Sequence, residues 1–97
     1  MSLYFIGSMD RLDLEVYGRY ELEAFKTLQM YDGVEALAVC DDPKLVEGVL
    51  PGKRVVLFKV RDQATFDKWY NSPAYQAAKA LRLQSADTKF LLTVDAL

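Results

Sequence analysis

Three segments with the composition of β-strands are apolar on both faces, and this pattern restricts the fold more than any other feature of the sequence. The alternating positions are Val34, Ala36, Ala38 and Cys40 against Leu37 and Val39, Val55 and Leu57 against Val56, Phe58 and Val60, and Phe90, Leu92 and Val94 against Leu91. An antiparallel sheet with one face in water shows alternating hydrophobic and polar residues instead. Both faces of this sheet are therefore expected to be buried.

Strand and helix signals follow one another in a familiar order. Strands are predicted at 3–9, 34–41, 54–60 and 88–94, a helix at 14–31, a brief extended piece at 44–48, and a broken helical region before the last strand. The order strand, helix, strand, strand, broken helix, strand predicts an α+β fold, the ferredoxin-like βαββαβ arrangement with an antiparallel sheet. We expect the 97 residues to form a single domain, 1–97.

Local signals predict where the helices begin and end. Asp13 and Asp62 are predicted N-caps, and Gly33 is the expected C-terminal cap of the first helix. Ser72 followed by Pro73 predicts the start of a new helix. The backbone N–H at the first position of a helix has no partner inside the helix, so a proline, which lacks this N–H, is well tolerated there. The alanine-rich face of that helix is expected to approach a sheet closely.

The predicted helices suffice to cover only one face of the sheet. The other face must be buried by something outside the chain, and a second copy packed sheet against sheet about a two-fold axis is the simplest source. The sequence therefore predicts a homodimer.

The absence of histidine excludes several kinds of site. It removes Ser-His-Asp and Cys-His nucleophilic systems and histidine-ligated metals, and the aspartates lack the spacing of a metal loop. No glycine-rich phosphate loop is present. We expect neither a metal nor a cofactor, and acid–base chemistry, if present, must use Asp, Glu, Tyr, Lys or Cys. Cys40, inside an apolar strand, is expected to be a buried core thiol.

Charge and hydropathy restrict the partners and the compartment. A net charge of -2, a pI near 5.0 and scattered basic residues argue against nucleic acid. An RNA-recognition module has the same order of elements, but the central strand offers only Phe58 for base stacking. No apolar run approaches the roughly 20 residues that span a bilayer, so we expect a soluble, cytoplasmic protein without membrane contact.

Several motifs are similar to those of a known family. They are Trp69-Tyr70-Asn71-Ser72-Pro73-Ala74-Tyr75-Gln76, Leu81-Arg82, Ser85-Ala86, Tyr17-x-x-Tyr20, Tyr31-Asp32-Gly33, Leu45-Val46-Glu47-Gly48 and Arg54-Val55-Val56. Together they resemble domain-of-unknown-function family 1330. The resemblance implies a place in the dimeric α+β barrel superfamily, with a cleft between sheet and helices. Asp32-Gly33 replaces the family's usual Gly-Gly pair, and Ala74 replaces a glutamate, so no role of that carboxylate is carried over.

The candidate ligand-binding residues fall into two groups. Tyr17, Trp69, Tyr75 and Arg82 are expected to line the cleft, with Tyr75 and Arg82 seven positions apart on one helix. Aromatic residues at helical spacing are also ordinary core residues, and Arg82 has the alternatives of reaching solvent or pairing with a carboxylate.

Glu47 and Arg54 form the second group, at either end of a tight connection. As a structural pair they would pin the loop. As a functional pair, Glu47 would act as a base, with Arg54 or Arg82 stabilising an enolate or carboxylate.

Two functional interpretations stay open. The first is a small-molecule-binding protein, and the superfamily resemblance implies cofactor-independent monooxygenase or isomerase chemistry. The alternative is a non-catalytic homodimeric binding or structural protein. The alternative predicts that Arg82 and Glu47 face solvent or each other and that no sizeable cavity lies beside Trp69.

Overall fold

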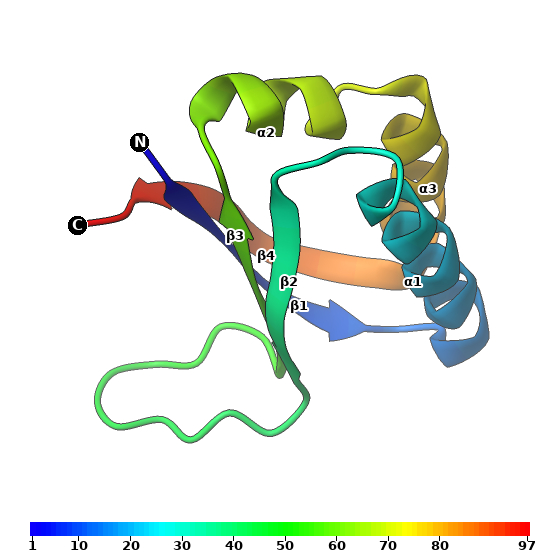
Figure 1. The fold of residues 1–97 in the computed structure, drawn as a ribbon. Coiled ribbons are helices and arrows are strands. Elements are labelled where there is room, and N and C mark those ends of the chain that lie inside the picture. The colour runs from blue at the N-terminus through cyan, green and yellow to red at the C-terminus, as the bar shows by residue number, and fades with distance from the viewer.

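The computed structural model describes residues 1–97 and confirms the predicted order of elements. The elements are β1 (Leu3–Arg11), α1 (Leu14–Leu28), β2 (Val34–Cys40), β3 (Arg54–Val60), α2 (Gln63–Tyr70), α3 (Pro73–Ser85) and β4 (Ala86–Asp95) (Figure 1). The strands form one antiparallel sheet in the order β2-β3-β1-β4, which is the ferredoxin-like topology. None of the three helices is long and apolar enough to cross a membrane.

All three predicted N-caps are confirmed. The side chain of Asp13 accepts a hydrogen bond from the backbone N–H at the third position of α1, and Asp62 does the same for α2. Ser72 caps α3, with Pro73 as its first residue. These contacts satisfy backbone donors that have no partner inside the helix, so they fix each helix start within one turn.

Several predicted boundaries differ from the structure. Helix α1 ends at Leu28, where the next backbone N–H bonds to carbonyls of the last turn, and Gly33 (φ 93°) lies in the turn that leads to β2. Strand β1 extends to Arg11, and β4 begins directly after α3 because the two strands pair along their whole length. The extended piece predicted at 44–48 is not paired and belongs to the long loop between β2 and β3.

A register shift in β2 changes which of its residues share a face. The shift falls between Ala36 and Ala38. Ala36 and Val39 consequently lie on the helix-covered face, whereas Ala38 and Cys40 lie on the opposite face. The predicted strict alternation is therefore wrong beyond Ala36. The prediction of a buried Cys40 is also wrong, because its thiol is exposed in this chain.

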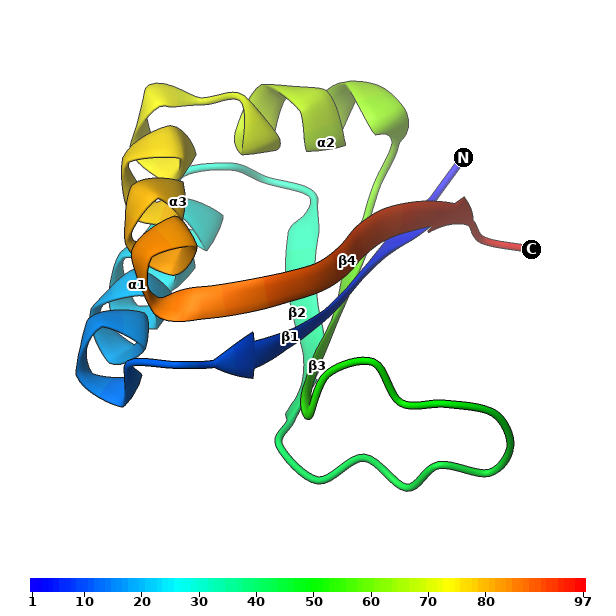
Figure 2. The ribbon, with the colours of Figure 1, turned by 180° about the vertical axis from the view of Figure 1, so that it is seen from behind.

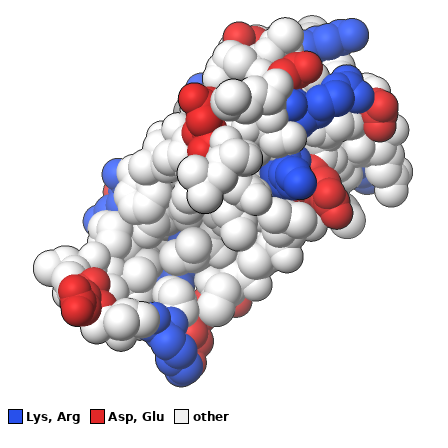
Figure 3. Space-filling model, turned by 60° about the vertical axis from the view of Figure 1, so that its left-hand side comes forward, with Lys and Arg blue, Asp and Glu red and all other residues white.

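The helices cover one face of the sheet and leave the other open. Figures 1 and 2 show α1, α2 and α3 on one side only. Figure 3 turns the opposite side of the molecule forward, and most of its surface carries no charged side chain. By strand register the open face consists largely of Tyr4, Ile6, Ala38, Cys40, Val55, Leu57, Phe90, Leu92 and Val94.

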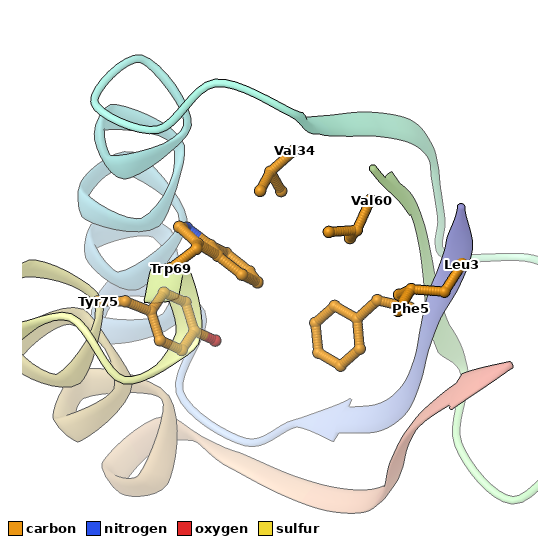
Figure 4. Close-up of a cluster of buried hydrophobic side chains, with 6 residues drawn as sticks. All are labelled: Leu3, Phe5, Val34, Val60, Trp69 and Tyr75. Atoms are coloured by element: carbon orange, nitrogen blue, oxygen red, sulfur yellow. The ribbon is translucent and has the colours of Figure 1, made fainter. Parts of the chain in front are cut away.

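The core lies between the sheet and the helices and is rich in aromatic rings. Its buried members are Leu3, Phe5, Val34, Val60, Trp69 and Tyr75 (Figure 4). The Trp69 indole donates to the hydroxyl of Thr27 at 2.8 Å, which ties α2 to α1. Helix α3 packs mainly against α1 rather than against the sheet, so the expected partner of its alanine face was wrong. The aromatic residues thus fill the space between the helices and the strands.

Candidate functional site

A small apolar cavity lies between α1 and the helix-covered face of the sheet. Its volume is about 40 Å³, and 13 of its 14 lining residues are hydrophobic. This volume holds on the order of three water molecules. Phe25 of α1 and Val39 of β2 are the lining side chains most exposed to solvent, each at 39%. The cavity therefore opens between α1 and β2.

The predicted residues Tyr17, Trp69 and Tyr75 all line this cavity. Each is 1–2% exposed, and the ring centroids of Trp69 and Tyr75 lie 4.7 Å apart. In Figure 4 the rings of Trp69 and Tyr75, from the helices, and Phe5, from the sheet, point toward one interior space. These aromatic residues are therefore both part of the core and part of the cavity wall. The two interpretations drawn from the sequence, core residue and cleft-lining residue, are compatible.

A pair of hydroxyl groups forms a polar point in the cavity wall. The hydroxyls of Tyr20 and Tyr75, from α1 and α3, lie 2.9 Å apart. Burial raises the pKa of Tyr20 well above its usual value, and burial also raises the pKa of Tyr75 although the hydrogen bond with Tyr20 and the charge of Arg82 lower it. Both phenols are therefore protonated at neutral pH and offer O–H donors.

Arg82 lies beside this pair and is itself only 2% exposed. Its guanidinium carbon lies 5.9 Å from the centroid of the Tyr20 ring, and Nη1 donates to Thr88 Oγ1 at 2.7 Å. Nε has no acceptor, and Arg82 takes part in none of the ion pairs of the chain. Arg82 does not line the cavity directly. Tyr20 and Tyr75, which do line the cavity, are the lining residues next to its charge.

Arg54 is 6% exposed and, unlike Arg82, has carboxylate partners. Its guanidinium forms ion pairs with Glu21 of α1 and, at 2.5 Å, with Asp41, which also pairs with Arg11 at 3.1 Å. Burial lowers the pKa of Arg54, but the hydrogen bond to Asp41 and the charge of Glu21 raise it overall. The group also lies 5.3 Å from the Tyr17 ring centroid. Arg54, on β3, thus connects α1 with Asp41, the residue that follows β2, and Asp41 in turn pairs with Arg11 of β1.

The carboxylate beside the cavity that pairs with Arg54 is Glu21, whereas the sequence analysis had predicted Glu47 in this role. Glu21 is the one lining residue of the cavity that is not hydrophobic, and Arg54 holds it there. Glu47 is exposed in the β2–β3 loop and makes none of the ion pairs. The available signal was helical spacing, because Glu21 is four residues from both Tyr17 and Phe25 on α1. No group of three metal-ligating side chains is present.

Sequence comparison places the chain in a family. The model for "Domain of unknown function (DUF1330)" matches residues 2–96. Among curated proteins, none has a matching sequence.

Solved structures share the fold over almost the whole chain. A protein of unknown function from Rhodopseudomonas palustris has a TM-score of 0.79 at 14% identity, covering 99% of this chain and 82% of that chain. A dimeric ferredoxin-like protein of unknown function from Jannaschia sp. CCS1 has a TM-score of 0.75 at 14% identity, covering 99% and 100%. SnoaB, a cofactor-independent oxygenase from Streptomyces nogalater, has a TM-score of 0.73 at 7% identity, covering 99% and 93%.

Proposed function

The chain belongs to the DUF1330 family, and we propose that it is a homodimer that binds a small planar apolar molecule in the cavity between α1 and the sheet. The carrying observation is the cavity wall, which combines aromatic rings with one polar point, the Tyr20–Tyr75 hydroxyl pair. Binding sites for small molecules are mostly apolar with a few placed polar groups that fix orientation. A cytoplasmic location and the absence of nucleic-acid and membrane partners stay predictions from the sequence.

The size of the cavity limits what enters it without movement. A volume of about 40 Å³ is smaller than a benzene-sized ligand requires. Phe25 and Val39, at the exposed side, are the side chains whose rotation would widen it. We therefore expect ligand entry to depend on these two positions.

The open sheet face supports the homodimer. Apolar surface left in water costs free energy, at about 25 cal/mol per Å², and a largely apolar face of this extent is typical of an interface. The dimeric ferredoxin-like protein from Jannaschia sp. CCS1 supports the same assembly here, because it shares the fold over its whole length. A second copy packed on this face would bury Leu57, Leu92 and Val94.

We also propose that the cavity supports a reaction that needs no cofactor. The oxygenase from Streptomyces nogalater has the same fold and works without a cofactor. In this chain Glu21 is the carboxylate that lines the cavity, and the tyrosine hydroxyls can hold an oxygen of the substrate. Monooxygenase- or isomerase-type conversion of an activated aromatic or dicarbonyl compound fits these groups.

Fluorescence of Trp69, the only tryptophan, tests binding in the cavity. Nitrobenzene is expected to quench it saturably, because an electron-poor ring would lie against the indole. Ala24→Met fills the cavity and should abolish the saturable phase, whereas Ala77→Met, on the exposed side of α3, should leave it intact. Quenching that rises without saturation, and equally in both variants, would refute the site.

Sedimentation velocity tests the homodimer. Leu57→Lys places a charge in the open face and should yield monomers at micromolar concentration. Leu22→Lys, on an exposed position of α1, is the matched control and should remain dimeric. A wild-type monomer at micromolar concentration would refute the assembly.

A non-catalytic homodimer is the second candidate, and the small cavity favours it. Against it stands Arg82, which faces inward rather than toward solvent. Native mass spectrometry of the purified protein separates the two, because a retained small molecule supports the first function and a bare dimer without any turnover supports the second.

A further inference from the structure

We propose that the Tyr20–Tyr75 hydroxyl pair, with Arg82 behind it, is an oxyanion site, and that the ligand of the cavity is a planar compound with an acidic hydroxyl, a phenol or an enol. This inference rests on the proposed binding function and names its ligand class. The site joins three elements of the fold, because Tyr20 lies on α1, Tyr75 and Arg82 lie on α3, and Thr88 on β4 holds the guanidinium.

One of the two phenolic O–H donors of the pair is not used in the hydrogen bond between them. Two hydroxyls 2.9 Å apart share one hydrogen bond, in which one phenol donates and the other accepts. The accepting phenol keeps its own proton, and the guanidinium of Arg82 beside Tyr75 is a donor only and cannot accept it. Since both rings line the cavity, that remaining O–H is available to an oxygen of the ligand.

Arg82 supplies positive charge that no carboxylate neutralises. Its Nη1 donates to a neutral hydroxyl, that of Thr88, and its Nε is buried without an acceptor. A buried cation without a counter-ion is costly, and negative charge nearby reduces that cost. Negative charge on a ligand oxygen bonded to the tyrosine pair would lie within the field of this guanidinium.

The position of Arg82 next to the tyrosines and outside the cavity lining favours an anion with a single charged oxygen over a carboxylate or phosphate. A carboxylate or phosphate is best held by direct, bidentate contact with the guanidinium fork. Here Arg82 does not line the cavity, whereas Tyr20 and Tyr75 do, so a ligand in the cavity meets the phenols rather than the guanidinium fork. A single oxygen that ionises near neutral pH matches a single O–H donor, and a planar ring attached to it matches the aromatic walls formed by Trp69 and Phe5.

The test compares 4-nitrophenol with nitrobenzene, using the quenching of Trp69. Above the pKa of the free phenol, 4-nitrophenolate should bind about tenfold more tightly than nitrobenzene, as expected for a hydrogen bond to a charged group. The absorbance band of bound 4-nitrophenolate should also persist to lower pH than in free solution. The proton released on binding goes to the buffer, so affinity for total phenol should rise with pH through that range.

Three variants locate the effect. Tyr75→Phe and Tyr20→Phe remove only a hydroxyl, and Arg82→Met removes the charge at similar volume. Each should lose most of the preference for 4-nitrophenolate over nitrobenzene, measured as the ratio of the two affinities in the same variant. Tyr31→Phe, whose ring does not line the cavity, is the control and should keep the preference. Circular dichroism checks that each variant is folded.

The outcomes separate the two proposals. Equal binding of 4-nitrophenolate and nitrobenzene, or a preference that survives in both tyrosine variants and in Arg82→Met, would overturn the oxyanion site and leave the binding function standing. Saturable binding of neither probe would overturn both. Tighter binding of the phenolate that disappears in Tyr75→Phe supports the site even if Arg82→Met fails to fold.

Discussion

Arg54 and Arg82 are almost equally buried, at 6% and 2% exposure, yet their surroundings differ. Arg54, near the β2–β3 end of the sheet, has two carboxylate partners. Arg82, near the end of α3, has a threonine hydroxyl and the face of a tyrosine ring. Both have an unpartnered Nε, so the difference lies in the counter-charge.

This difference indicates different roles for the same residue type. A buried ion pair is strongly destabilising to break, because removing one partner leaves the other charged and uncompensated. Removing a buried charge that has no counter-ion leaves no uncompensated partner behind, so it lacks this cost. We therefore assign Arg54 to the fold and Arg82 to the site.

The largest expected effect is that of Arg54→Met. Glu21 and Asp41 would lose their common partner, and α1 would lose its ionic tie to the sheet. We expect a loss of about 3 kcal/mol in the free energy of unfolding, at the low end for a buried pair because both carboxylates are partly exposed. Urea denaturation measures it. Arg61→Met, which breaks an exposed pair with Asp32, should cost less than about 1 kcal/mol; equal losses would remove the structural role of Arg54.

Thr88→Asp would give Arg82 the counter-charge that it lacks. The new carboxylate would take the place of the hydroxyl that accepts from Nη1 at 2.7 Å. We expect stability to rise by about 1 kcal/mol, and the preference for 4-nitrophenolate to fall because the charge is neutralised. Thr88→Val, which only removes the acceptor, should instead lower stability; a loss with both variants would show that the site does not accept an anion.

Arg82→Met should change the free energy of unfolding by less than about 1 kcal/mol, because it removes a buried charge and no ion pair. The contrast with Arg54→Met under identical urea conditions is the decisive comparison. A loss as large as that of Arg54→Met would mean that Arg82 is structural.

The smallest expected effect is a difference in acid stability. The hydrogen bond from Arg54 lowers the pKa of Asp41 from its ordinary value of 3.8, although burial opposes the shift. A carboxyl whose pKa is lower in the folded state stabilises the fold above its ordinary pKa, and this contribution is lost as pH falls through the folded value. Thermal unfolding below pH about 4 should therefore depend less on pH in Asp41→Asn than in the wild type, and Arg82→Met should keep the wild-type slope.

Most of the fold was predictable because its signals are local or periodic. Asp13, Asp62 and Ser72 cap helices through bonds that span three residues, so the sequence reveals them directly. The order of strands and helices followed from periodicity and turn residues. The register shift between Ala36 and Ala38 was not predictable, because a bulge is defined by the partner strand.

The site was predictable only in part. The aromatic residues at 17, 69 and 75 were found because large rings at helical spacing mark an interior face. Glu21 was missed because a carboxylate on a helix is usually solvated, and only the approach of Arg54 from β3 makes this one part of the cavity. Glu47 was predicted from its proximity to Arg54 in a short connection, but the loop leaves it exposed.

The sequence by itself determined the helix starts, the βαββαβ order and the apolar character of both sheet faces, because each depends on neighbours along one element. Only the tertiary structure decided which carboxylates meet Arg54, that none meets Arg82, and that the Tyr20 and Tyr75 hydroxyls come together. These contacts join residues 13 to 55 positions apart, so their geometry depends on strand register and helix placement together. The assignment of one arginine to stability and the other to binding follows from that geometry.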